Sequence, residues 1–355
     1  MTVLVTSLEE STGKTAVALA LAVAARDRGE RVGYMKPKGT RLQSAVGKTV
    51  DEDPQLAREL LDLEAEMHEM EPIVYSPTFI HEAIRGREDT AALRTEVETQ
   101  FESLSETVDR MILEGGGSFT TGGIVDLTDG DLAELLDATV IIVAPFSDPG
   151  DVDELLAASE LLGDRLGGIL FNSVSDAAYD ILASDVIPFL EGRGLRVYGA
   201  IPHQEDLAGV TVEELATELG AELLTSDVSV DGRVQRFVVG TSTGDVYGRL
   251  RQVRDAALVT GGDRTDMQTA ALEAAGIECL VVTGGIRPPD VVVGRAESAG
   301  VPILFVRTDM RTTIDRVEDV IRSGRTRDES TVARMGELLT DYADIDAMLP
   351  PIESE

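Results

Sequence analysis

The chain has 355 residues, of which 65 are acidic and 31 basic, giving a formal net charge of −34 at pH 7. So acidic a surface repels phosphates, which excludes nucleic acids and anionic membranes as partners. No apolar run is long enough to span a membrane, nothing at the N-terminus resembles a signal peptide, and a single cysteine excludes an internal disulfide. We therefore expect a cytoplasmic protein. The acid excess, with almost every lysine replaced by arginine, favours a high-salt cytoplasm, where the Debye length shortens to about 3 Å.

The first element in chain order is a short apolar strand near Val3–Thr6 that leads into a phosphate-binding loop, Ser7–Thr15. The alanine-rich helix that follows presents unpaired backbone N–H groups, which can hold an anion. Lys14 can reach β- and γ-phosphate oxygens, and the Thr15 hydroxyl can bind Mg²⁺. The residues expected to bind nucleotide phosphates here are Ser11, Thr12, Gly13, Lys14 and Thr15.

This loop departs from the general pattern of phosphate-binding loops, which has a glycine five residues before the Gly-Lys pair. Leu8 occupies that position here, and a spacing that starts one residue earlier places Ser7 there instead. The alternative interpretation is an ordinary helix N-terminus, capped by Ser11 or Thr12, with Lys14 in solvent. We favour phosphate binding because Gly-Lys-Thr directly follows a strand and opens a helix.

Apolar runs of strand length alternate with helical periods over about the first two hundred residues, which predicts an α/β domain with a mainly parallel sheet. The expected strands are Val3–Thr6, Arg31–Met35, Arg110–Leu113, Thr139–Ala144, Gly168–Phe171 and Val197–Ile201. The expected helices include Asp53–Leu61, Thr90–Val108, Asp151–Leu162, Ala177–Glu191 and Val212–Leu219. Right-handed crossovers would make the sheet doubly wound, with ligands at the carboxyl ends of its strands.

Lys36 follows the second expected strand, and all four lysines of the chain lie within its first 48 residues. A cation at this position can neutralise a transferring phosphoryl group or an acceptor carboxylate. The alternative is a surface lysine before a turn proline. Asn172 ends another expected strand, where its amide can pair with a purine edge or simply form a turn.

Glu114 ends the third expected strand, at a point where a carboxylate can meet Mg²⁺ or an attacking water. Gly115 and Gly116 follow it, and their backbone can approach phosphates closely. Asp53, or else Asp51, starts the next helix after the second strand and is the candidate for a second carboxylate ligand. The alternative for Asp53 is a solvated side chain, which is common in an acidic protein.

The polar, turn-rich segment Thr225–Gly232 marks the expected boundary between a first domain, residues 1–226, and a second, residues 227–345, with an acidic tail at 346–355. Strands are expected in the second domain at Arg236–Val239, Ala257–Thr260, Glu278–Thr283 and Pro302–Val306. Helices are expected at Val246–Arg254, Asp266–Ala275, Pro288–Ala299, Thr312–Ser323 and Ser330–Tyr342. Two of these strands end in Val-Thr-Gly-Gly, and we expect those glycines to form tight turns.

Taken together, these motifs resemble the dethiobiotin synthetase family of P-loop proteins, followed by a DRTGG domain. Over nearly the whole chain, that order is similar to the N-terminal regulatory part of long phosphate acetyltransferases. Their transferase domain would follow Glu355, and we expect it to be absent. The residues that carry the resemblance are Ser7, Gly13–Thr15, Lys36-Pro37, Asp53, Glu114–Gly117 and Asn172, then Val259–Asp266, Thr308-Asp309 and Thr312-Thr313.

The resemblance implies ATP and Mg²⁺ as cofactors and a homodimer as the assembly. It implies that Lys14 and Lys36 are the catalytic cations, the latter at the γ-phosphate and acceptor side. Thr15, Asp53 and Glu114 would form the metal site. Asn172 would read adenine, with the loop Ile201–Gln204, which includes Pro202, closing over the base.

Two departures weaken the link to biotin chemistry. Lys38–Arg41 stands where the synthetase has a serine-rich turn, and Tyr75–His81 does not match its substrate loop. The favoured function is therefore a nucleotide-sensing regulatory protein that controls an acyl-CoA or acetate enzyme in trans. The alternative is an ATP-dependent ligase that activates a carboxylate or carbamate.

Overall fold

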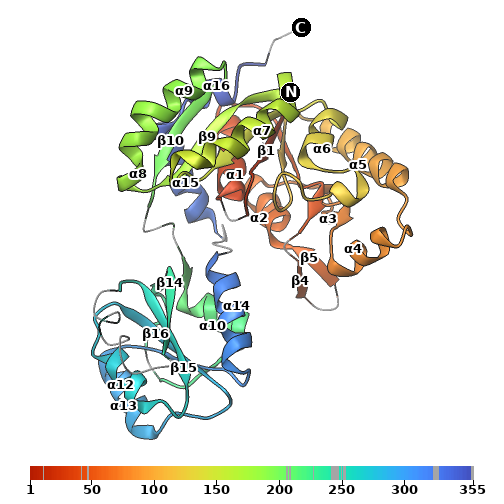
Figure 1. The fold of residues 1–355 in the computed structure, drawn as a ribbon. Helices are drawn as coiled ribbons and strands as arrows, with labels where there is room; N and C mark the ends of the chain where they lie inside the picture. The colour runs from red at the N-terminus through yellow and green to blue at the C-terminus, as the bar shows by residue number, and fades with distance from the viewer. Residues whose placement is uncertain are drawn as a thin grey trace. The chain divides into compact units, whose positions relative to one another are not determined.

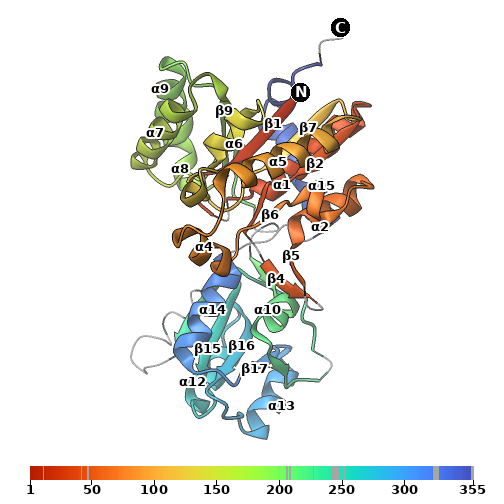
Figure 2. The same ribbon diagram turned by 90° about the vertical axis from the view of Figure 1, so that its right-hand side faces the viewer.

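The computed structural model describes residues 1–10, 12–40, 42–45, 48–204, 207, 209–226, 228–240, 248, 250, 253–322 and 328–352. It divides the chain into two compact units, Met1–Gln204 with Thr326–Glu355, and Glu205–Arg325 (Figures 1 and 2). No helix within these described ranges is both long and apolar enough to cross a membrane.

The first unit is built on a six-stranded sheet in which every neighbouring pair is parallel. In spatial order its strands are β10 (Val197–Pro202), β9 (Leu166–Val174), β8 (Thr139–Ala144), β1 (Thr2–Thr6), β7 (Arg110–Glu114) and β2 (Val32–Met35). Two small sheets lie outside it: β3 (Lys38–Gly39) with β6 (Ile73–Val74), and β4 (Leu42–Ala45) with β5 (Lys48–Asp51). The predicted mainly parallel α/β class is confirmed.

Helices cover both faces of this sheet, as a doubly wound fold requires. The helices before the second unit are α1 (Lys14–Asp27), α2 (Glu52–Leu61), α3 (Met67–Met70), α4 (Pro77–Ile84), α5 (Thr90–Ser105), α6 (Asp129–Leu135), α7 (Val152–Leu162), α8 (Asp176–Ile181) and α9 (Ile187–Gly192). Shorter turns are η1 (Gly123–Val125), η2 (Pro149–Asp151), η3 (Gly163–Arg165) and the π-turn η4 (Leu182–Val186), which joins α8 to α9. After the second unit come α15 (Glu329–Tyr342) and α16 (Ile345–Met348).

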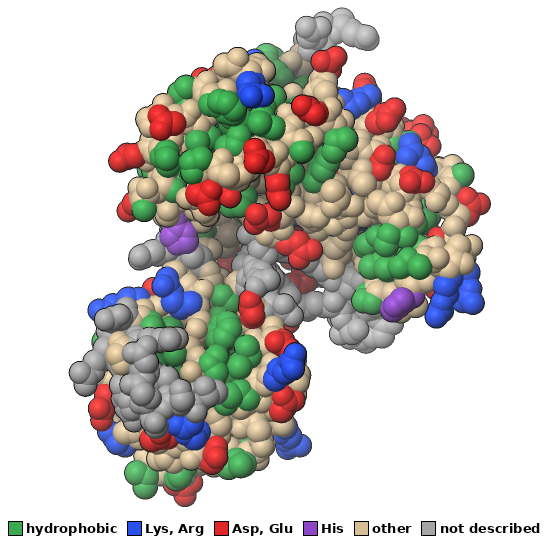
Figure 3. Space-filling view, in the orientation of Figure 1, with side chains coloured by type: hydrophobic (Ala, Val, Ile, Leu, Met, Phe, Trp, Pro, Cys, Tyr) green, Lys and Arg blue, Asp and Glu red, His purple; other side chains and the backbone are tan. Residues whose placement is uncertain are grey.

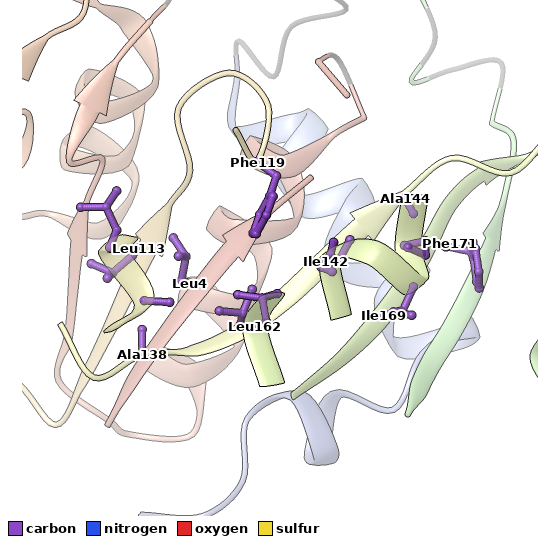
Figure 4. Packing of buried hydrophobic residues seen from close by; sticks show 14 of the residues in the cluster. Leu4, Leu113, Phe119, Ala138, Ile142, Ala144, Leu162, Ile169 and Phe171 are labelled. Carbon is purple, nitrogen blue, oxygen red and sulfur yellow. The ribbon is translucent and has the colours of Figure 1, made fainter. Parts of the chain in front are cut away.

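The core on one face of the sheet joins strand side chains to α5, α6 and α7. Figure 4 shows Leu4 of β1, Leu113 of β7, Ile142 of β8 and Ile169 of β9 in this layer, with Leu162 of α7 packed against them. These residues alternate along their strands with side chains that face the other side, as the pleat of a strand dictates. The sheet is therefore buried on both faces, which explains its nearly continuous apolar strands.

The opposite face is covered by α1, which is itself covered by α15. The alanine-rich sequence of α1 lets its neighbours approach closely, and ten of its residues are buried. Helix α15 buries Val332, Met335, Leu338 and Leu339, which recur at helical spacing along one side. A helix that follows the second unit in the sequence thus completes the core of the first.

The second unit has a five-stranded sheet with helices on both faces. In spatial order its strands are β12 (Glu222–Leu223), β17 (Ile303–Phe305), β16 (Ile277–Thr283), β15 (Ala256–Gly261) and β14 (Arg236–Gly240). The helices of this unit whose bounds are described are α10 (Val212–Leu219), α12 (Thr265–Leu272), α13 (Asp290–Ala299) and α14 (Met310–Arg322). Strand β11 (Val210–Thr211) pairs with β13 (Arg233–Val234). All strands of the larger sheet are parallel except β12, which is antiparallel to β17.

These units differ from the predicted domains at both boundaries. The first boundary lies at residue 204 and not 226, because α10 packs against α14 and β12 pairs with β17. The second lies at 325 and not 345, because α15 packs on α1. The described part of the predicted acidic tail is folded: Arg28 donates to the carbonyl of Leu349 and Arg110 to that of Pro350. Most of the predicted helix 246–254 lies outside the described residues.

Candidate functional site

The loop between β1 and α1 places a buried cation at the start of the helix. Gly13 is the N-cap of α1 and has a left-handed φ of 87°, which favours glycine. Lys14 and Thr15, the first two residues of α1, are both buried. Lys14 Nζ donates to Ser7 Oγ at 2.9 Å and also to the carbonyl of Gly117. The ammonium therefore lies between the phosphate loop and the loop after β7.

The alternative of an ordinary capped helix with a solvated lysine is wrong on two counts. Lys14 is 7% exposed, and Gly13 occupies the cap position, with no side-chain cap among the described residues. Ser11, the other candidate, lies outside them. The Thr12 hydroxyl is buried and, within the described chain, accepts or donates no hydrogen bond. A buried hydroxyl without a partner beside a helix N-terminus fits a phosphate oxygen as its partner.

Glu114, the last residue of β7, is hydrogen-bonded to helix α1 and to strand β2. Its Oε1 accepts a hydrogen bond from Thr15 Oγ1 at 2.7 Å, and its Oε2 accepts one from the Tyr34 hydroxyl at 2.6 Å. Burial, opposed by the charge of Lys36 and reinforced by that of Asp53, raises the pKa of Glu114 to about 7. Burial and the nearby carboxylates also raise the pKa of Tyr34 well above its ordinary value. Both oxygens of this carboxyl group are thus held in fixed positions.

Lys36 is fully buried among three carboxyl groups, so the alternative of a surface lysine is wrong. Its Nζ lies 2.8 Å from Asp51 Oδ2 and 3.5 Å from Glu114 Oε1, and it donates to Asp53 Oδ2. Burial disfavours the ammonium, but the charges of Asp53, Glu114 and Asp51 together outweigh it and raise the pKa of Lys36. Three carboxylates around one cation leave a surplus of negative charge when all are ionised.

Both candidate aspartates, Asp51 and Asp53, form ion pairs with Lys36. Asp51 is the N-cap of α2 and accepts hydrogen bonds from the backbone N–H of Asp53 and of Thr40. Asp53 lies in the first turn of α2 and is 3% exposed, so it is not a solvated side chain. Because Asp51 fixes the start of α2, the carboxylates of Asp51 and Asp53 reach Lys36 from the same helix N-terminus.

The predicted metal ligands Thr15, Asp53 and Glu114 are brought together, with Lys36 between the two carboxylates. Within the described residues, no three His, Cys, Asp or Glu side chains are grouped so that they alone could hold a metal ion. This donor set is nevertheless the type that Mg²⁺ accepts, because Mg²⁺ takes oxygen ligands and usually keeps water and substrate phosphates in its shell. The magnesium site stays a prediction.

Asn172, at the far side of the loop, holds its backbone. Its Nδ2 donates to the carbonyl of Thr12 at 2.8 Å, and a Cβ at Gly13 would lie 2.5 Å from that nitrogen. The adenine-reading role predicted for Asn172 is not tested, but the structure gives this amide a second task. Pro202 lies at the end of β10, and the next residue, His203, lies 2.8 Å from Ser173 Oγ through Nδ1.

From the sequence, no role was predicted for Lys38. Lys38 is fully buried, and its Nζ lies 3.0 Å from Asp129 Oδ1, which is also fully buried. The predicted glycines fit closely around this pair: a Cβ at Gly115 would lie 2.1 Å from Asp129 Oδ2, and one at Gly116 would lie 2.3 Å from the carbonyl of Lys38. The scarcity of lysine pointed to Lys38 as much as to Lys36, but nothing in the sequence identified its partner.

Two family models match this chain in order. Residues 1–211 match the AAA domain family AAA_26, and residues 214–320 match the DRTGG domain. A dethiobiotin synthetase-like P-loop domain followed by a DRTGG domain, expected from the motifs, is thereby confirmed.

Curated relatives include the phosphate acetyltransferase of Pseudomonas putida, 25% identical over 351 residues, which cover 93% of this chain and 48% of the relative. The ATP-dependent dethiobiotin synthetase of Methanococcus vannielii is 25% identical over 179 residues, which cover 50% of this chain and 81% of that protein. The chain thus spans about half the length of the phosphate acetyltransferases. A crystal structure of the CBS and DRTGG domains of Clostridium perfringens pyrophosphatase, 14% identical, covers 40% of this chain and 72% of its own, with a TM-score of 0.27.

Proposed function

The chain belongs to the AAA domain family AAA_26, and we propose that its first unit binds ATP together with Mg²⁺. One observation carries the proposal. At the start of α1, the Thr15 hydroxyl donates to Glu114, Lys14 precedes Thr15 in the same turn, and Lys36, directly after β2, lies within 3.5 Å of Glu114. Hydroxyl, carboxylate and two ammonium groups at a helix N-terminus form the set that holds nucleotide phosphates and their metal.

Different residues of the site bind the phosphates, the metal and the base. Lys14 and the N–H groups of α1 bind phosphate oxygens, and Thr15, Glu114 and Asp53 hold the metal. Mg²⁺ would supply positive charge against the phosphates, and the carboxylates around Lys36 would favour its binding. Lys36 lies on the side of the γ-phosphate, and its three carboxylates keep it protonated there. Asn172 keeps the phosphate loop in place and, with Pro202, borders the site for adenine.

We further propose that the chain is a nucleotide-sensing regulatory protein in acetyl-CoA or acetate metabolism, a homodimer that acts on an enzyme of that metabolism in trans. Similarity to phosphate acetyltransferases over 93% of the chain supports this role, as does the DRTGG domain that follows the P-loop domain. The second candidate is an ATP-dependent carboxylate or carbamate ligase. Similarity to dethiobiotin synthetase and the presence of both lysines and both carboxylates favour it.

The deciding experiment measures ATP binding and ADP formation with Mg²⁺ in molar KCl, using the wild type, Lys14→Ala and the control Arg85→Ala. Arg85 is an exposed cation at the end of α4. We expect Lys14→Ala to weaken ATP binding at least about tenfold, the loss expected for a charge-assisted hydrogen bond, and Arg85→Ala to match the wild type. Equal affinity in all three proteins would contradict the site.

Turnover separates the two functions. Tight ATP binding without ADP formation agrees with the sensor and contradicts the ligase. Rapid ADP formation that depends on an added carboxylate or amine contradicts the pure sensor. If the wild type binds no ATP, both functions lose their basis.

A further inference from the structure

The second unit contains a topological switch point between β16 and β17. Helices α12 and α13, which follow β15 and β16, contribute Met267, Ala271, Val292 and Ala296 to the core on one face of the sheet. Helix α14, which follows β17, contributes Val317 and Val320 to the core on the opposite face. Neighbouring parallel strands whose connections leave toward opposite faces open a crevice at their carboxyl ends, where open α/β sheets bind ligands.

A cavity of about 370 Å³ lies next to this switch point, at the carboxyl end of β17 and on the side of β12. Its wall is formed by residues 305–308 at the carboxyl end of β17, by Leu219 and Gly220 at the end of α10, and by Glu222 at the start of β12. Small-molecule sites in proteins have volumes of about 300–1,000 Å³. The cavity is therefore large enough for a small metabolite, and all of its wall belongs to the second unit.

The charges around the cavity favour an anion. Arg287 Nη2 donates to both oxygens of Glu222, at 2.7 and 2.6 Å, and the same guanidinium stacks on the Phe305 ring at 5.1 Å. Hydrogen bonding to Arg287, with the charges of Arg287 and Arg307, lowers the pKa of Glu222. One carboxylate thus faces two guanidinium groups, which leaves a positive surplus in a chain whose net charge is −34.

The other acidic side chain at this loop is engaged elsewhere. Asp309 accepts hydrogen bonds from the backbone N–H groups of Arg311 and Thr312 and from the Thr312 hydroxyl, at the start of α14. The Asp309 carboxylate therefore caps α14. Among the described contacts it forms no ion pair with Arg307. Arg307 is exposed and belongs to the cavity wall.

The two loops that carry these arginines are joined to each other. Gly284 and Gly285, after β16, have left-handed φ values of 81° and 69°, and Gly284 N donates to the carbonyl of Thr308 at 2.8 Å. The Thr308 hydroxyl in turn lies 2.8 Å from that of Thr313, which is fully buried. Backbone and side-chain bonds therefore hold both loops before any ligand arrives, which lowers the entropy cost of binding.

We propose that this cavity binds a small anionic metabolite that bears a carboxylate or a phosphate. Arg307 is the cation that contacts the ligand, and Arg287 holds the carboxylate of Glu222, which is part of the cavity wall. The inference concerns the second unit only and does not depend on ATP binding by the first.

The test uses the full chain and two probes, inorganic phosphate and acetate, titrated by calorimetry at constant ionic strength. The variants are Arg307→Gln, the control Arg311→Gln and Lys14→Ala. Arg311 is an exposed arginine four residues further along the chain. We expect at least one probe to saturate the wild type, and Arg307→Gln to weaken that binding at least about tenfold. Arg311→Gln should match the wild type, and Lys14→Ala should retain the binding that Arg307→Gln loses.

A second measurement places the ligand at the cavity. The chain contains no tryptophan, so Phe305→Trp would supply a single tryptophan in the cavity wall. Its emission, excited selectively over that of the tyrosines, should change with the same midpoint as the heat. Three results overturn the proposal: no saturable response of the wild type to either probe, equal losses in Arg307→Gln and Arg311→Gln, or a loss confined to Lys14→Ala. Calorimetry on the wild type keeps the test decisive if Phe305→Trp does not fold.

Discussion

Lys38 Nζ lies 3.0 Å from Asp129 Oδ1, and neither side chain is exposed to solvent. The same ammonium donates to the carbonyls of Thr121 and Leu127, both at 2.6 Å, and Asp129 accepts a further hydrogen bond from Thr6. Thr6 is the last residue of β1, directly before the phosphate loop. This buried pair therefore fixes the loop after β7 against the strand that carries the phosphate loop.

We predict that Lys38→Met lowers the free energy of unfolding by about 3–5 kcal/mol, because Asp129 is then buried without its cation. Urea unfolding in KCl measures the loss. The double variant Lys38→Met/Asp129→Asn removes the unpaired charge and should be more stable than Lys38→Met alone. A double variant no more stable than the single one would show that the pair is not a buried ionic contact.

Gly116→Ala should destabilise the same region. The added Cβ would lie 2.3 Å from the carbonyl oxygen of Lys38, so backbone must move, at a cost of about 1–3 kcal/mol. The matched control is Gly192→Ala in α9, where a Cβ meets no atom within 4 Å. Thermal unfolding should show a lower midpoint for Gly116→Ala and an unchanged or higher one for the control. Equal midpoints would contradict the close approach of the two loops.

Titration of Glu71 should make the free energy of unfolding depend on pH, and a single substitution can remove this contribution. Burial, and then the charge of Asp51, raises the pKa of Glu71 from 4.5 to about 7, against the hydrogen bond from Asp51 N and the charge of Lys36. The folded state therefore binds this proton more tightly than the unfolded chain. This contribution to the free energy of unfolding falls as pH rises from about 4.5 to about 7 and is level above that range.

Glu71→Gln removes this titration while its amide oxygen can still accept from Asp51 N. We expect the difference in unfolding free energy between variant and wild type to shift by about 2 kcal/mol in favour of the variant between about pH 5 and about pH 8. Urea titrations at both pH values measure it. The control Glu134→Gln, at an exposed position of α6, should show the same change of unfolding free energy with pH as the wild type. If Glu71→Gln also shows that same change, the pKa of Glu71 is not raised.

Salt should stabilise the folded chain. Acidic side chains are spread over the surfaces of both units in the face drawn in Figure 3, consistent with the net charge of −34. Raising the ionic strength from about 0.1 M to about 1 M shortens the Debye length from about 10 Å to about 3 Å and screens their repulsion. The urea midpoint should therefore rise with KCl and equally with NaCl. An equal midpoint at both concentrations would remove the argument for a high-salt environment.

The elements that the sequence predicted well are those with a local signal. Strand β8 and helix α10 have the predicted bounds, because an apolar run and a capping threonine mark them directly. The phosphate loop was predicted for the same reason: Gly13, Lys14 and Thr15 are adjacent in the sequence. Lys36 and Glu114 could be placed near it because parallel strands end at one edge of a sheet.

The features that the sequence did not reveal depend on distant partners. Lys38 and Asp129 are 91 residues apart, and no local pattern joins them. The pairing of β12 with β17, which moves the first boundary, links short segments from opposite ends of the second unit. Asp51 was ranked behind Asp53, although the cap that it forms explains how both reach Lys36.

The packing of α15 on α1 has a consequence for synthesis of the chain. A nascent chain that has reached Gln204 contains every strand of the six-stranded sheet but lacks the helix that covers α1. The ribosome must add the whole of Glu205–Arg325 before that helix emerges, which takes about 6–25 s at about 5–20 residues per second. For that interval the side of α1 that α15 covers in the folded chain lacks this covering helix.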